Sequence, residues 1–359
     1  MSSVAVAGPP VRRKRRLVDR LPIVHQVRQS VGLQRGMLIT GLVITGGFVL
    51  TAILAPWLAP YKYNQLREDG VAFGAQQPPS ADHLLGTTVG GFDVLSRVIW
   101  GAQTAILVII VAVTLSIFVG VFLGLVSGYI GGWLDRVLVV VCDAVYAFPS
   151  LLLAIVMSIV ISGGRSNLIG GIFAAAISIT VVFIPQYFRV IRAETVRIKA
   201  EAYVESARVL GASNSRIMFR HVLRNATRTL PLIFTLNASE AILTLAGLGF
   251  LGFGIEPTSA AEWGYDLFKS VSDVTSGIWW TSVFPGLAIV ISVLGVTLVG
   301  ESLNDLADPR LRGRRAAADA GLAAETTTVP GGVLGAGPGG LAGLEPVVRR
   351  DVDGAGAPS

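Results

Sequence analysis

Six long runs of apolar residues constrain this chain more than any other feature of its sequence. They cover roughly residues 37–59, 103–130, 137–162, 168–188, 230–254 and 282–303. Each run is long enough to cross the ~30 Å hydrocarbon layer of a bilayer as a helix. Because unpaired backbone polar groups are costly in lipid, only helices and closed barrels span it. The sequence therefore predicts an all-α membrane protein with six transmembrane helices.

The charge content supports this class. Hydrophobic residues make up 52% of the 359 residues, and charged residues only 14%. Soluble globular domains carry nearly twice that charged fraction, about 25%. The net charge of +6 comes from cations that lie between the apolar runs, where they orient a membrane protein. We therefore expect a lipid bilayer, and no nucleic acid, as the partner of this basic chain.

Lysine and arginine are unevenly distributed between the runs. The N-terminal arm, residues 1–36, has eight of them, and segment 189–229 has nine. Segments 60–102, 163–167 and 255–281 have only five together. Cytoplasmic segments of membrane proteins carry the excess of positive charge. This predicts that both termini and segment 189–229 are cytoplasmic, whereas 60–102 and 255–281 are extracytoplasmic.

The end of the chain differs from the rest. Residues 313–359 are mainly Gly, Ala and Pro, with little apolar surface to bury. Such composition favours disorder, so we expect a disordered cytoplasmic tail. The arrangement predicted is a basic arm, a first span, an outer loop at 60–102, a core at 103–312 with the other five spans, and this tail.

Segment 189–229 has the pattern of a helix, a turn and a second helix. Residues 190–210 contain no Gly or Pro, and Gly211 then stands where a positive φ ends many helices. Ser213 or Asn214 can cap a second short helix that runs to about Arg224. Arginines at every fourth position would form a basic face of that helix, with apolar side chains on another side: Arg216, Arg220, Arg224 and Arg228, and Ile217, Met218 and Val222. Such an elbow is suited to docking.

Glu205, Ser206 and Ala207, followed after three residues by Gly211, resemble the EAA loop of permease subunits in ATP-binding-cassette (ABC) importers. Five further stretches are similar to the C-type subunit of the dipeptide/oligopeptide branch, in order between residues 35 and 312. They are GTTVGGFDVLSRVIWGAQTAI (86–106), GYIGGWLDRVLVVVCDAVYAFPSLLLAI (128–155), AILTLAGLGFLGFGIEP (241–257), WWTSVFPGLAI (279–289) and LNDLADPRLR (303–312). One departure is Leu223-Arg224, where the family has Leu-Pro, so the second elbow helix is expected to continue without a break.

The resemblance implies the type I ABC importer permease fold, which is MetI-like, and coupling to a separate ATPase through the elbow. A solvated basic loop would need only cations and not the spaced Glu205, Ala207 and Gly211. The residues implied in ATPase coupling are Glu205, Ala207, Gly211, Ser213, Arg216, Ile217, Met218 and Arg220.

The resemblance also implies partners and a location in the bacterial plasma membrane. The partners are a homologous second permease chain, two ATPase subunits or domains, and an extracytoplasmic substrate-binding protein. ATP and Mg would belong to the ATPase, because this chain has no phosphate-binding G-x-x-x-x-G-K-[ST] sequence and no catalytic constellation. We expect a non-catalytic subunit without cofactor or metal, which transports dipeptides or oligopeptides. Glutathione, nickel chelates and haem are alternatives within the same class.

Asp143 in the third predicted span and Glu240 in the fifth are ionisable residues at membrane depth. Charged groups at membrane depth face a cavity or a partner. They would either line a peptide pathway and attract the amino terminus of the substrate, or be paired or hydrated within the bundle. We favour pairing or hydration for Asp143, close to the cytoplasmic end, and leave both interpretations open for Glu240.

A different class of transporter is the alternative to the importer. An ion-gradient-driven secondary transporter or channel subunit often contains inverted repeats with broken helices at corresponding positions. We find no convincing repeat in this sequence, and the elbow has no role in such a protein. The sequence therefore favours the importer.

Overall fold

The computed structural model describes residues 33–163 and 168–307, and these residues form helices with one small hairpin. The helices are α2 (Leu33–Leu58), α3 (Val94–Ile130), α4 (Gly132–Tyr146), α5 (Ser150–Ser162), α6 (Leu168–Lys199), α7 (Ala202–Val209), α8 (Asn214–Arg216), α9 (Leu223–Ala226), α10 (Leu230–Phe250), α11 (Trp263–Thr275) and α12 (Trp280–Ala307). A π-helical turn, η2 (Ile217–Val222), and a 3-10 turn, η3 (Thr227–Thr229), complete the series. Most of the predicted basic arm and the whole predicted tail lie outside the described residues.

The hairpin is short and lies in the loop between α2 and α3. Strand β1 (Arg67–Glu68) pairs antiparallel with β2 (Val71–Ala72), so that Arg67 is opposite Ala72. Gly70 in the turn has a φ of 83°. The predicted all-α membrane fold is confirmed, and the hairpin is a local feature of one loop.

Five continuous helical stretches are long and apolar enough to cross a membrane, and the number is six if the bent pair of α4 and α5 is counted as one span. The continuous stretches are α2, α3, α6, α12 and the run from α8 to α10, over Asn214–Phe250. The last of these confirms that the second elbow helix continues without a break past Arg224.

The prediction of one continuous third span, 137–162, is wrong. Helices α4 and α5 meet at an angle of 97° between Tyr146 and Ser150. Pro149 has a ψ of 124° and lacks the N–H that helix propagation requires. Its ring also disfavours the helical conformation of Phe148. The apolar composition runs through this break, and so the pattern alone suggested a single helix.

Two helices extend beyond the apolar runs that predicted them. Helix α3 begins at Val94 rather than at residue 103, where Asp93 Oδ2 accepts a hydrogen bond of 2.7 Å from Ser96 N. Helix α6 continues to Lys199, past the end of its apolar run at residue 188. The end of an apolar run marks the expected edge of the lipid layer, whereas a helix continues as long as its residues favour it.

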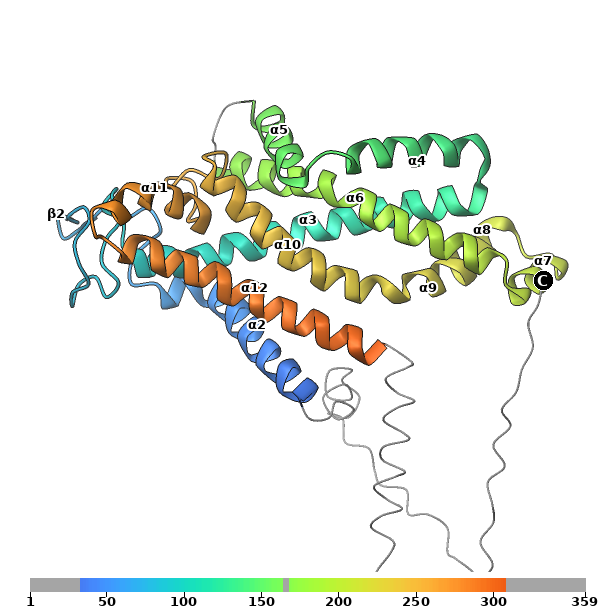
Figure 1. Cartoon of the computed structure of the whole chain (residues 1–359), viewed down its shortest axis with the longest axis horizontal. Coiled ribbons are helices and arrows are strands. Elements are labelled where there is room, and N and C mark those ends of the chain that lie inside the picture. Colours follow the sequence, from blue (N-terminus) through green and yellow to red (C-terminus); the bar gives the residue numbers. More distant parts are fainter. Residues whose placement is uncertain (1–32, 164–167, 308–359) are drawn as a thin grey trace, which may run out of the picture. The chain divides into compact units, whose positions relative to one another are not determined.

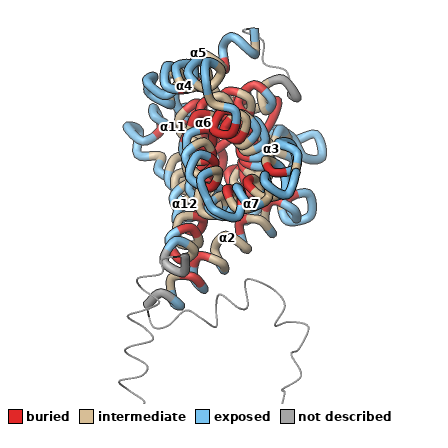
Figure 2. The backbone as a smooth tube through the Cα atoms, turned by 90° about the vertical axis from the view of Figure 1, so that its right-hand side faces the viewer, coloured by how far each residue is buried: buried red, intermediate tan, exposed pale blue. Residues whose placement is uncertain are grey.

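Helices α3 and α6 lie side by side through the centre of the bundle (Figures 1 and 2). Three glycines on one face of α3, Gly120, Gly124 and Gly128, allow this approach. A Cβ at Gly124 would lie 2.6 Å from the carbonyl oxygen of Phe188, and one at Gly128 would lie 2.8 Å from that of Arg192. Small residues let membrane helices approach closely, since packing rather than hydrophobicity holds them together.

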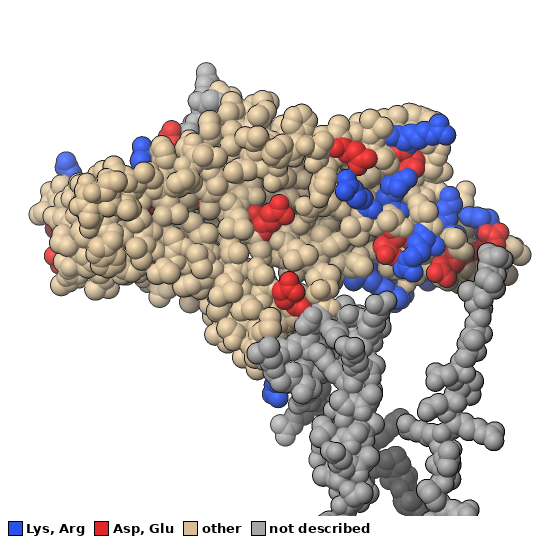
Figure 3. Space-filling view, viewed as in Figure 1, with Lys and Arg blue, Asp and Glu red and all other residues tan. Residues whose placement is uncertain are grey.

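The two ends of the bundle differ in character. One end, which we call the loop end, carries β1, β2 and α11; the other, the elbow end, carries the α3–α4 turn, α7 and α8 (Figure 1). In Figure 3 the acidic and basic side chains gather at the elbow end, and the surface between the ends carries few charges. Large apolar side chains are exposed on the apolar helices, among them Val43 in α2, Val140 in α4, Leu152 in α5 and Val290 in α12. Such an uncharged band is typical of helices that face lipid or a second membrane subunit.

Candidate functional site

The elbow, residues 200–229, is held against α3 and α6 by polar contacts. Lys199 at the end of α6 donates from Nζ to the carbonyl oxygen of Tyr129, at 2.6 Å. The hydroxyl of Tyr129 donates to Oδ1 of Asn214 in α8, at 3.0 Å. The elbow therefore has a fixed position relative to the end of α3.

Gly211 provides the turn of the elbow, as the sequence predicted. Its φ is 82°, and a Cβ at this position would meet no atom within 4 Å. The requirement for glycine is thus conformational and not steric. Its N–H donates to the carbonyl oxygen of Arg208 at 3.0 Å, which satisfies an acceptor at the end of α7. Ser213 Oγ then accepts from Arg216 N at 3.4 Å and caps the second helix.

A small apolar core fixes the angle of the elbow. Val204, Ile217, Val222 and Ala226 are fully buried there, and Ala207 and Met218 pack against them half-buried. Ile217 and Val222 are five residues apart, and the π-helical turn between them directs both inward, since it bonds residue i to i+5. Ala207, Ile217 and Met218 therefore support the shape of the elbow from within.

The π-helical turn also changes the predicted basic face. Arg216, Arg220, Arg224 and Arg228 are all exposed. The turn lies within this series, so the four side chains do not keep the regular i, i+4 spacing of an α-helix. Glu205 is exposed as well, and its Oε2 accepts from Nη1 of Arg208 at 3.0 Å.

The tip of the elbow exposes two large apolar side chains that the sequence analysis did not single out. Val209 is 80% exposed and Leu210 is 87% exposed, directly before Gly211. The sequence did carry a signal for this exposed pair, because two apolar residues stand directly before the turn glycine among mostly polar neighbours. Exposed apolar side chains among charged ones mark a contact with another protein or a membrane.

Asp143 lies at the surface and is paired. Its Oδ1 accepts from Nη2 of Arg189 in α6 at 3.0 Å, and both side chains are more than half exposed. The guanidinium of Arg189 also lies 4.3 Å from the ring centroid of Tyr146. An exposed pair of this kind contributes little to stability, about 1 kcal/mol or less.

Glu240 lines a cavity of about 270 Å³ between α5, α6 and α10. Tyr146, Ser150 and Gln186 supply polar groups to the same wall, and Leu153 and Val182 supply apolar ones. Asp143 is not part of this lining, so the structure does not bring the two carboxylates of the predicted pathway into one cavity. Glu240 has no ion-pair partner within the described part of the chain.

Two known protein families match parts of this chain. Residues 120–313 match the binding-protein-dependent transport system inner membrane component. Residues 34–84 match the N-terminal transmembrane domain of oligopeptide transport permease C. The two matches cover the first span, the elbow and most of the bundle.

Individual relatives agree with this placement. A protein of Brucella suis, whose name describes it as a candidate peptide transport system permease, is 35% identical over 295 residues, which are 82% of this chain and 94% of the relative. The glutathione transport system permease protein GsiD of Salmonella typhimurium is 38% identical over 275 residues, 75% of this chain and 86% of the relative. The chain therefore belongs to the binding-protein-dependent transport system inner membrane components, in the oligopeptide permease C branch, and is a multi-pass inner-membrane permease subunit of an ABC transporter.

Proposed function

We propose that this chain forms half of the translocation pathway of an ABC importer for dipeptides, oligopeptides or the tripeptide glutathione. The elbow contacts a separate ATPase, which holds ATP and Mg, and a second, homologous permease subunit supplies the other half of the pathway. An extracytoplasmic binding protein delivers the substrate. The termini and the elbow end face the cytoplasm, and the loop end faces outward.

The observation that carries this proposal is the construction of the elbow. A membrane protein that only needed a solvated loop would not require a buried core at Val204, Ile217 and Val222. The core instead presents Val209 and Leu210 to the outside at a fixed place, among the exposed cations of Arg208 and Arg216. An apolar centre with a charged rim is the usual composition of a protein interface. Movement of the elbow would be transmitted to α6 and α10, between which it is continuous.

Family membership also supports the importer over a secondary transporter. Relatives named for peptide and for glutathione transport support a peptide-like substrate. Glu240 is the residue of the cavity that suits such a substrate, because its carboxylate can attract an amino terminus. Asp143 belongs to the pathway only if the pair with Arg189 opens.

Two pairs of variants test the role of the elbow in coupling. Gly211→Val introduces strain of about 1–2 kcal/mol, because a β-branched residue disfavours a φ of 82°. Gly211→Asn instead introduces a residue that tolerates a positive φ. Leu210→Ser removes an exposed apolar contact, and Leu84→Ser removes a 60% exposed leucine at the loop end as a control.

The measurements are retention of the ATPase subunits during purification and ATP turnover with loaded binding protein. We expect Gly211→Val and Leu210→Ser to insert normally but to lose coupling, the latter by roughly tenfold. Gly211→Asn and Leu84→Ser are expected to stay close to wild type. Wild-type coupling in both test variants would disprove the docking role of the elbow.

A further inference from the structure

A second cavity, at the loop end, is built from residues that have no part in the elbow or the Glu240 cavity. Its volume is about 240 Å³, and it lies between the 88–92 loop, α11 and the start of α12. Its lining includes the apolar residues Phe92 and Pro257 and the polar residues Ser270, Asp273 and Thr281. Val89, Gly90 and Lys269 are exposed and form its rim.

Asp273 gives this cavity an unsatisfied negative group. The residue is only 1% exposed, and its Oδ1 accepts from Nε2 of Gln76 at 2.6 Å. Its Oδ2 is buried without a hydrogen-bond partner among the described residues. A buried acceptor in this condition is destabilising, and more so if it is charged. A ligand that donates hydrogen bonds would remove this penalty.

Two neighbouring hydroxyls are also available as acceptors. The hydroxyls of Ser270 and Thr281 donate to the carbonyl oxygens of Leu267 and Ile278, at 2.9 and 3.3 Å, which leaves them only as acceptors. Asp266 is already paired with Arg97. Lys269 forms no ion pair among the described residues, and its Nζ lies 5.4 Å from the ring centroids of Tyr265 and Phe268.

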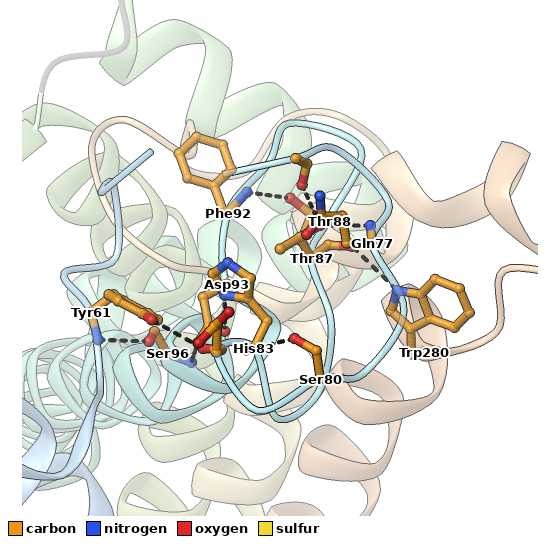
Figure 4. A network of polar contacts seen from close by, with 12 residues as sticks. Tyr61, Gln77, Ser80, His83, Thr87, Thr88, Phe92, Asp93, Ser96 and Trp280 are labelled. Atoms are coloured by element: carbon orange, nitrogen blue, oxygen red, sulfur yellow. Dashed lines mark hydrogen bonds and ion pairs between the residues drawn. The ribbon is translucent and has the colours of Figure 1, made fainter. Parts of the chain in front are cut away.

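The wall that faces α11 is held in place before any ligand arrives (Figure 4). Nδ1 of His83 lies 3.0 Å from Oδ1 of Asp93, and Phe92 N donates to Oγ1 of Thr88 at 3.1 Å. Trp280 Nε1 donates to the carbonyl oxygen of Thr87 at 3.3 Å, which ties the loop to α12. A preformed wall lowers the entropy that binding would lose.

We propose that this cavity binds a lysine or arginine side chain of the extracytoplasmic binding protein when that protein docks on the loop end. The inference rests on the proposed function for the orientation and the partner. Phe92, Pro257 and Val89 accommodate the apolar stem, and Asp273, Ser270 and Thr281 accept from the cationic head. The cavity offers the partnerless carboxylate oxygen of Asp273, and so it suits a single cationic head. A transported peptide would instead meet Glu240, whose cavity shares none of these residues.

The test measures the affinity of the binding protein for the complete permease–ATPase complex in nanodiscs. Asp273→Asn retains the acceptor for Gln76 but removes the charge, and Thr281→Val removes one acceptor at similar volume. Glu256→Gln is the matched control, since Glu256 is an exposed carboxylate of the same loop end outside the cavity. We expect affinity to fall at least about tenfold in Asp273→Asn and severalfold in Thr281→Val, with no change in Glu256→Gln. Retention of the ATPase subunits by each variant reports whether it has folded.

A photo-crosslinking amino acid at the exposed Val89 identifies what enters the cavity. Crosslinks to a lysine- or arginine-bearing segment of the binding protein support the proposal, and crosslinks only to peptide substrate overturn it. Lys269→Met, which removes the rim cation, is expected to keep or increase the affinity. If Lys269 itself filled the cavity, the Asp273→Asn complex would bind the binding protein with wild-type affinity. That result would overturn the proposed role of the cavity and leave the proposed function untouched. Absence of binding by the wild-type complex would instead overturn the proposed function.

Discussion

The side chain of Arg97 donates from Nε to both carboxylate oxygens of Asp266, at 2.7 and 2.8 Å, although 169 residues separate them. Both side chains are buried, at 1% and 7% exposure. The pair joins the first turn of α3 to α11, and Nη1 of Arg97 also donates to the carbonyl oxygen of Tyr63 at 3.1 Å. The loop end is therefore tied to the central helix of the bundle.

Removal of one member of this pair should destabilise the protein strongly. Arg97→Met leaves Asp266 buried without its cation, and we expect a loss of about 3–5 kcal/mol in the free energy of unfolding. The double variant Arg97→Met with Asp266→Leu should recover most of that loss, because no buried charge is left unpaired. Denaturant unfolding in detergent measures both, and equal losses in the single and double variants would contradict the argument.

Glu262 should make the stability of the loop end depend on pH. Burial raises the pKa of this carboxyl from its ordinary value of 4.5 to about 8, although the N–H groups of Gly264 and Tyr265 donate to it. Asp266 raises the pKa further and Arg97 lowers it. Between pH 4.5, where Glu262 titrates in the unfolded chain, and about pH 8, where it titrates in the folded protein, the folded state holds a proton that the unfolded chain has lost. The contribution of Glu262 to stability is thus greatest below about pH 4.5 and falls as pH rises to about 8, by roughly 1 kcal/mol per pH unit.

The measurement is the melting temperature of wild type and Glu262→Gln from pH 5.5 to 8.5. The glutamine variant cannot ionise, so its melting temperature should fall less over this range. Glu256→Gln, which changes an exposed carboxyl six positions earlier, should keep the wild-type slope. Equal slopes in wild type and Glu262→Gln would show that Glu262 does not titrate in this window.

Glu240→Gln should weaken transport of peptides with a free amino terminus. The carboxylate lines the cavity between α5, α6 and α10 and has no cationic partner there, so it can attract a substrate ammonium. We expect uptake in proteoliposomes to fall about tenfold for free peptides and little for N-acetylated forms that the binding protein also accepts. Glu301→Gln, an exposed glutamate of α12, is the control. An equal loss for both peptide forms would assign Glu240 a structural role.

Cysteine labelling in intact cells tests the orientation. Ser215 at the elbow end and Ser272 in α11 are both exposed, and neither side chain caps a helix. In a background with Cys142 replaced by alanine, an impermeant maleimide should label Ser272→Cys rapidly and spare Ser215→Cys. The reverse pattern would place the loop end in the cytoplasm.

Local properties of the sequence were enough to predict the spans and the turn of the elbow. Apolar length determines which segments can enter lipid, and the absence of a Cβ determines that Gly211 suits a φ of 82°. The replacement of the usual proline by Arg224 likewise predicted that the second elbow helix continues past this position, because helix continuation depends on near neighbours. The family resemblance, read from short motifs, was confirmed by the relatives.

Tertiary packing decided the remaining features. The 97° bend at Pro149 lies within an unbroken apolar run, and proline permits either a kink or a break, so only contacts with neighbouring helices select one. The inward positions of Ile217 and Val222 depend on a π-helical turn that packs against α3 and α6. The buried pair of Arg97 and Asp266, and the unsatisfied oxygen of Asp273, exist because the fold brings together segments far apart in the chain. No local rule connects such residues, since their interaction energy arises only after the helices have packed.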